Sequence, residues 1–252
     1  QVFECLSNDE INILLGEFVH LNRVEHDTER VLAAIATHHP AEVFKLLLKR
    51  IEYRKSQDYT YDAVPYTLYE LREVLSIHPQ EIILKARKDF DKDDFTMFVI
   101  GGAGDLIQKI FPAFPEPLEK VLLEILKRDN VDDYLFVAGI LRNYEGIDRI
   151  HNICQEIVNR LPENSKILDD IELALIDAGV VSGEYGLAEA YEERMSLVQD
   201  WLADDRPKVA KFAQSFIERT NKQIERERAR VDEQNMLRKH QFGDSDAVIE
   251  NT

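Results

Sequence analysis

The chain has 252 residues, 44% of them hydrophobic, two cysteines and a formal net charge of −17. A chain of this length can fold without disulfides or structural metals, and so few cysteines indicate a reducing compartment. The negative charge disfavours nucleic-acid binding, and the sequence contains neither a long apolar run nor a signal pattern. We therefore expect a cytoplasmic protein that does not associate with membranes.

Most of the chain is predicted to be helical. Ser7 and Glu10 form a capping-box pattern that starts a helix over residues 7–21, with an apolar face of Ile11, Leu14, Leu15, Phe18 and Val19. Further helices are predicted at residues 27–37, 64–77, 94–100, 105–111, 131–143, 147–160, 165–178 and 185–203. Because no segment alternates apolar and polar residues over a strand's length, the fold class is all-α.

A short phrase recurs along this helical part. His39-Pro40 and His78-Pro79 are each followed by glutamate two residues after the proline, and Pro117 begins a third copy. The prolines are spaced by 39 and 38 residues, and each opens an apolar helix. Repetition near 40 residues is typical of stacked helical hairpins, so the sequence predicts an α-solenoid with one helix pair per repeat.

The last long helix has the clearest pattern. A polar turn precedes Pro207, which suits a first helical position. Apolar residues then recur at helical spacing: Val209, Phe212, Ala213, Phe216 and Ile217. This stripe is expected to be buried.

Charge and apolar periodicity together divide the chain into three parts. Residues 1–204 hold 39 acidic and 21 basic side chains, whereas residues 205–252 hold 9 and 10. The sequence therefore predicts an acidic helical-repeat array over residues 1–204 and a long basic helix over residues 205–240 that closes the last repeat. Residues 241–252 lack a periodic pattern and are expected to form a flexible tail.

One segment resembles a known family. The pattern Asp204, Pro207, Val209, Lys211, Ala213 and Ile217 is similar to the second helix of a HEAT repeat, and the helix before it would be the first of that pair. The resemblance is best over residues 185–220 and extends loosely over about 200 residues by period and apolar pattern. It implies a right-handed α-solenoid that binds partners along a curved surface and carries no catalytic residues.

No set of residues indicates chemistry. The segment after Asp89 begins like a calcium loop, but Asp94 and Ile100 stand where that loop needs glycine and glutamate, so an acidic turn is favoured. His151 and Cys154 lack a second ligand pair for zinc, which favours a small buried thiol. We therefore predict no catalytic, cofactor-binding or metal-binding residue and no cofactor.

Two groups of residues are candidate contact surfaces. The first is a tyrosine cluster that includes Tyr59, Tyr61 and Tyr66, which either binds a partner or wedges helix pairs together. The second is the basic set Arg219, Lys222, Arg226 and Arg230, which either binds a partner or is a solvated face. Beyond Ile224 the apolar stripe thins, so that half of the helix either projects into solvent or lies on another surface.

These features favour a non-catalytic protein-interaction or scaffold region. Because the sequence starts at Gln1 and reads like an interior segment, we expect the C-terminal regulatory or sensor part of a larger protein, such as an NTPase. Its partner would be a protein or another domain of the same polypeptide. The alternative is an enzyme on a helical-repeat scaffold, such as a HEAT-like DNA glycosylase, which would need a basic groove. A third hypothesis is a helical oligomerisation module, but the regular heptads of a long coiled coil are missing beyond Ile224.

Overall fold

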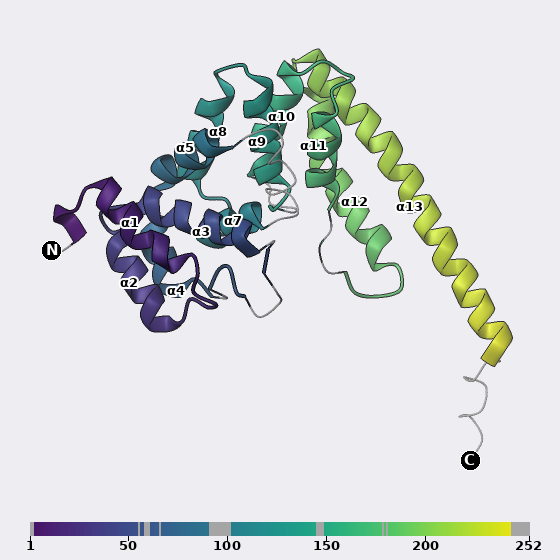
Figure 1. Ribbon diagram of the computed structural model, residues 1–252. Coiled ribbons are helices and arrows are strands. Elements are labelled where there is room, and N and C mark those ends of the chain that lie inside the picture. The colour runs from purple at the N-terminus through teal and green to yellow at the C-terminus, as the bar shows by residue number, and fades with distance from the viewer. Residues whose placement is uncertain are drawn as a thin grey trace. The chain divides into compact units, whose positions relative to one another are not determined.

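The computed structural model describes residues 3–54, 56–57, 61–65, 67–90, 102–144, 149–177, 179 and 181–242. The chain forms two compact units, Gln1–Ala174 and Leu175–Thr252 (Figure 1). The described residues contain α-helices and short 3-10 helices but no strand, which confirms the all-α prediction for this part of the chain.

The first unit contains most of the helices. They are η1 (Phe3–Cys5), α1 (Asn8–Phe18), α2 (His26–Ala36), α3 (Pro40–Arg54), α4 (Tyr69–Leu75), α5 (Pro79–Asp89), α7 (Ala103–Ile110), α8 (Glu116–Leu126), α9 (Val131–Leu141) and α10 (Ile150–Arg160). The next helix, α11 (Ile167–Ile176), includes the boundary between the two units.

Helices in the first unit contact one another in two series. One series joins α1 to α3, α3 to α5, α5 to α8 and α8 to α10, and the other joins α2 to α4, α4 to α7 and α7 to α9. Contacts of α2 and α4 with α3, and of α8 with α9, connect the two series (Figure 1). Within each series, the contacts therefore join helices that are next but one in the order of the described helices.

The recurring proline phrase begins helices of the same series. Pro40, Pro79 and Pro117 lie in the first turns of α3, α5 and α8. Proline suits the first turn because its missing N–H would have no partner there. The predicted capping box is also present, since the Ser7 hydroxyl accepts from the Glu10 N–H and the Glu10 carboxylate accepts from the Ser7 N–H.

Several predicted boundaries are wrong. The first helix ends at Phe18, and Leu14 is 37% exposed although it was placed on the buried face. The helix predicted over residues 64–77 begins at Tyr69 and ends at Leu75. It cannot begin earlier because Leu68 adopts a left-handed conformation with φ of 45°. The helix predicted over residues 94–100 lies outside the described residues. The order of the described helices agrees with the prediction.

A buried arginine organises the start of the first unit. Arg50 on α3 is fully buried and donates to the carbonyl oxygens of Phe18 and Val19 at the end of α1. It also donates to the carbonyls of Asp62 and Ala63, and its guanidinium lies 4.8 Å from the centre of the Tyr61 ring. Burial lowers the pKa of Arg50 from its ordinary value. One side chain thus connects α1, α3 and the segment after α3.

The second unit is built around a helical hairpin. It contains α12 (Gly186–Val198), the 3-10 helix η3 (Gln199–Ala203) and α13 (Pro207–Phe242), so the single helix predicted over residues 185–203 is divided in two. The Asp204 carboxylate accepts from the backbone N–H of Arg206, at 2.8 Å, and from its guanidinium. This turn ends η3 and starts α13 at the predicted proline.

Candidate protein-interaction surface

The predicted apolar stripe fixes one face of α13. Val209, Ala213 and Phe216 are fully buried, and Phe212 is 8% exposed. The ring of Phe212 lies between Trp201 of η3 and Phe216, with centroid distances of 6.2 and 6.3 Å. Aromatic rings at these distances bury a large apolar area. The first half of α13 is therefore anchored by a core within the second unit.

The second half of α13 lies along α12. Ile224 and Val231 continue the buried stripe. Polar contacts then join the two helices toward the far end of the hairpin, where the Tyr185 hydroxyl donates to Asp232 and the Glu184 carboxylate accepts from Asn235 and Arg238. The hydrogen bond to Asp232 raises the pKa of the Tyr185 hydroxyl above its ordinary value. Of the two outcomes predicted for this half of the helix, contact with another surface is the one observed.

The sequence did not indicate the α12 side of these contacts. Arg228 forms an ion pair with Glu192 at 2.7 Å, and Gln223 donates to the Tyr191 hydroxyl at 3.0 Å. The local signal was only that acidic residues alternate with apolar ones in α12. Pairing them with α13 required knowledge of the hairpin's register, which no local pattern supplies.

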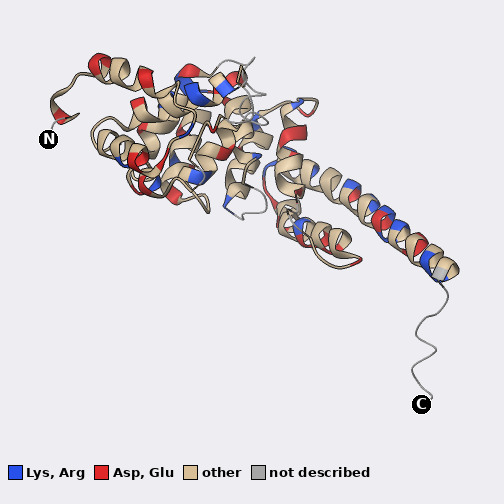
Figure 2. Ribbon diagram, turned by 60° about the horizontal axis from the view of Figure 1, so that its bottom comes forward, with Lys and Arg blue, Asp and Glu red and all other residues tan. Residues whose placement is uncertain are grey.

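The four predicted basic residues share one exposed strip of α13. Arg219, Lys222, Arg226 and Arg230 are all exposed. At 100° per residue they fall within an arc of about 80°, and they span roughly 16 Å along the helix. We call these four residues the basic strip. Figure 2 shows that basic and acidic residues alternate along α13.

Members of the basic strip differ in their contacts. Arg230 pairs with Glu227 within α13 at 2.8 Å, and Arg219 is engaged in an interaction inside the chain. Within the described part of the chain, no hydrogen bond or ion pair engages Lys222 or Arg226. These two cations are the ones available to another molecule.

An exposed apolar pair lies beyond the strip. Met236 and Leu237 are 69% and 56% exposed. Leu237 follows Arg219 by 18 residues, which is five helical turns, so it falls on the same line of the helix surface as the strip. The strip therefore continues into a small apolar surface near the end of α13.

The described tyrosines between residues 53 and 69 differ in exposure, since Tyr69 is 59% exposed whereas Tyr61 is buried. Tyr61 is 3% exposed, its hydroxyl donates to the Val19 carbonyl, and its ring meets Tyr53 edge-on at 5.4 Å. Tyr61 therefore lies inside the first unit, and its partner-binding role stays a prediction. Tyr59 and Tyr66 lie outside the described residues.

The structure describes only part of the groups that were considered for chemistry. Cys154 is buried, and burial raises the pKa of its thiol far above the ordinary value. Within the described ranges, no group of three or more His, Cys, Asp and Glu side chains is placed to hold a metal ion. The segment considered for calcium falls largely within residues 91–101, outside the described part.

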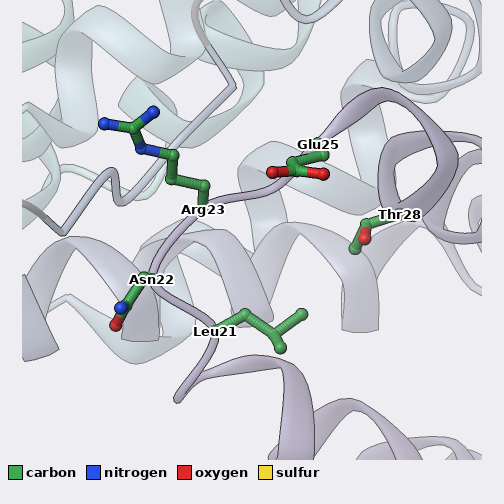
Figure 3. A pocket seen from close by; sticks show the side chains of 5 residues that line it. All are labelled: Leu21, Asn22, Arg23, Glu25 and Thr28. Atoms are coloured by element: carbon green, nitrogen blue, oxygen red, sulfur yellow. The ribbon is translucent and has the colours of Figure 1, made fainter.

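An open pocket of about 520 Å³ lies at the loop between α1 and α2 (Figure 3). It is lined by Leu21, Asn22, Arg23, Glu25 and Thr28. Asn22 and Arg23 extend to different sides of the loop in Figure 3, and Arg23 pairs with Asp62 at 3.3 Å. Because its polar groups do not converge on one point, the pocket lacks the arrangement that positions a small ligand.

Comparisons with known proteins complete this description. Among the helices that the structure describes, none has the length and apolar character needed to cross a membrane. No family model matches the chain, and neither a curated protein nor a solved structure is significantly similar to it.

Proposed function

We propose that this chain is a non-catalytic protein-interaction region whose helices stack as a HEAT-like α-solenoid and whose partner binds the basic strip of α13. The partner is either a separate protein or another domain of the same polypeptide. The observation that carries the proposal is that Lys222 and Arg226 are exposed on a helix that buries another of its faces, without an ion pair in the described part of the chain.

The two series of helix contacts support the scaffold part of this proposal. In a solenoid each helix pair contacts only its neighbours, and the array presents an extended surface. The described helices of the first unit support this arrangement, since the main contacts within each series join consecutive members of that series. Helices α3, α5 and α8, which begin with the recurring proline phrase, are consecutive members of one series.

The anchoring of α13 supports the binding part. An ordered helix presents its side chains without the entropy cost of folding a disordered segment on binding. Phe212 and Phe216 hold the first half of α13, and contacts with α12 hold the second. The strip therefore projects from a helix that is already formed, which favours binding.

The test is affinity purification of the tagged chain from its source cells under gentle conditions. We expect one protein to be retained at near-equal amounts by the wild type and by the control Lys49→Glu/Arg72→Glu, which reverses two exposed charges of the first unit. The variant Lys222→Glu/Arg226→Glu should lose that protein. The proposal is wrong if no protein is retained in a fixed ratio by the wild type.

A further inference from the structure

The charges and apolar residues of α13 indicate what kind of partner fits it. Resting on the proposed function, we propose that the basic strip together with Met236 and Leu237 is a docking site for an acidic helix of a protein partner. That helix carries carboxylates at intervals of three and four residues and apolar side chains at one end. The apolar end of the partner helix would lie on Met236 and Leu237, which sets the direction in which that helix binds.

The spacing of the strip suits another helix. The basic residues are separated by three, four and four positions, which is the spacing of side chains along a helix–helix contact. Ala229 is exposed at the edge of this arc, which widens it to about 100°, and Ser215 is exposed inside the arc just before Arg219. The small side chain of Ala229 allows a second backbone to approach between the long basic ones.

The charges of the strip require an acidic partner. Lys222 and Arg226 carry positive charges that no described residue neutralises, whereas the adjacent Arg230 forms an ion pair with Glu227. Carboxylates placed opposite these cations form charge-assisted hydrogen bonds, which are stronger than neutral ones. A second copy of the same strip would instead place like charges against each other, so the site does not pair with itself.

The apolar pair supplies affinity and direction. Exposed ion pairs contribute little to binding because water and salt screen them. Met236 and Leu237 are the largest apolar side chains exposed near the strip, and covering them removes apolar surface from water. Because this pair lies at only one end of the strip, a partner with apolar residues at one end can bind in one direction only.

A protein helix fits this surface better than a nucleic acid does. Glu218 and Glu225 are exposed beside the strip, and Glu233 is exposed within its arc beyond Arg230, so all three would face the dense phosphate charges of a duplex. The chain's net charge of −17 also repels a polyanion at long range. A helix can place its few carboxylates opposite the basic residues alone and avoid these glutamates.

The experiment uses the full chain and two fluorescein-labelled helical peptides of about 18 residues, which matches the length of the strip and its apolar end. Both carry glutamates at intervals of three and four, with two leucines at the amino end of one and at the carboxyl end of the other. A peptide of the same composition in scrambled order is the control. Binding is measured by fluorescence anisotropy at about 0.15 M salt.

We expect one peptide to bind more tightly than its reverse and than the scrambled control. Lys222→Glu/Arg226→Glu should weaken this binding by about tenfold or more, and Met236→Asn/Leu237→Asn by about threefold to tenfold. The control Lys49→Glu/Arg72→Glu should change it by less than about twofold. Circular dichroism shows whether each variant keeps its helices, and Lys222→Gln/Arg226→Gln replaces the charge reversal if it does not.

Three results would overturn the inference. One is that neither ordered peptide binds below about 1 mM, and another is that the charge reversal leaves peptide binding unchanged. The third is that a short DNA duplex binds more tightly than both peptides and loses binding on the same charge reversal, which would make the strip a nucleic-acid site. If a cellular partner is retained through the strip while the peptides fail, the proposed function stands and only the partner's chemistry is wrong.

Discussion

Around α3, in the first unit, the positive charge of Arg50 is fully buried, whereas along α13, in the second unit, Lys222 and Arg226 are exposed. Arg50 donates its hydrogen bonds to backbone carbonyls of two segments, the end of α1 and the segment after α3. The two residues of α13 have no such partner among the described residues. The buried guanidinium of Arg50 already has its hydrogen-bond partners within the fold. The exposed charges of Lys222 and Arg226 lie on an anchored helix and are available for binding.

The comparison depends on α13 being anchored by its aromatic core. Phe216→Ala should lower the free energy of unfolding by about 3–5 kcal/mol, since the ring is fully buried and its loss leaves a cavity. Urea unfolding followed by circular dichroism measures this change. The neighbouring exposed Gln214→Ala should alter stability by less than about 0.5 kcal/mol. A loss under about 1 kcal/mol for both Phe212→Ala and Phe216→Ala would show that the stripe is not core.

The structural role of the buried charge can be tested in the same way. Arg50→Lys keeps the charge but cannot donate to all of the carbonyls that the guanidinium reaches, so we expect a loss of about 2–3 kcal/mol. The control is Arg54→Lys, the same change at an exposed position of α3, which should cost less than about 0.5 kcal/mol. Equal effects of the two substitutions would contradict the proposed role of Arg50.

The sequence predicts the helices better than it predicts the buried structural role of Arg50 or the contacts that anchor α13. The proline phrase and the Phe212–Phe216 stripe are local patterns, because they depend on residues less than two helical turns apart. The shortening of α4 was not predictable, since the left-handed conformation of Leu68 has no sequence signal as clear as a glycine. Local patterns therefore fixed helix type and order but not every boundary.

Arg50 shows why contacts between distant segments were missed. Its partners at Phe18 and Asp62 are backbone oxygens, which carry no residue-specific signal. One clue was present, since Arg50 follows Leu47 by three positions and Val43 by seven and so lies on the apolar face of α3. A charged residue on a buried face predicts a satisfied buried charge, though not its partners. The basic strip was predictable because its four residues lie on one helix.

The Thr220 hydroxyl of α13 is a buried polar group without a hydrogen-bond partner in the described structure, unlike the guanidinium of Arg50. Thr220 is fully buried. Thr220→Val should therefore raise the free energy of unfolding by about 1 kcal/mol. The control is Thr37→Val, because the Thr37 hydroxyl donates to the Ala33 carbonyl at 3.1 Å and its loss should cost about 1 kcal/mol. Destabilisation by both changes would mean that the Thr220 hydroxyl has a partner in solution.

The smallest expected effect concerns the turn that starts α13. The side-chain and backbone hydrogen bonds from Arg206 lower the pKa of the Asp204 carboxyl to about 2. A lowered folded-state pKa adds stability that is fully present above the unfolded value near 4 and is lost as the pH falls toward 2. Because this pair lies near the surface, its contribution should be about 1 kcal/mol or less.

The measurement for this turn is a carboxyl carbon NMR titration of Asp204, combined with the stability of Asp204→Asn. The titration midpoint should lie near pH 2. The wild type should be the more stable protein at neutral pH, and the difference from Asp204→Asn should shrink as the pH falls from about 4 to about 2. A midpoint near 4 would show that Arg206 does not hold the carboxylate. The start of α13 would then depend on Pro207 and the aromatic core, without a contribution from this ion pair.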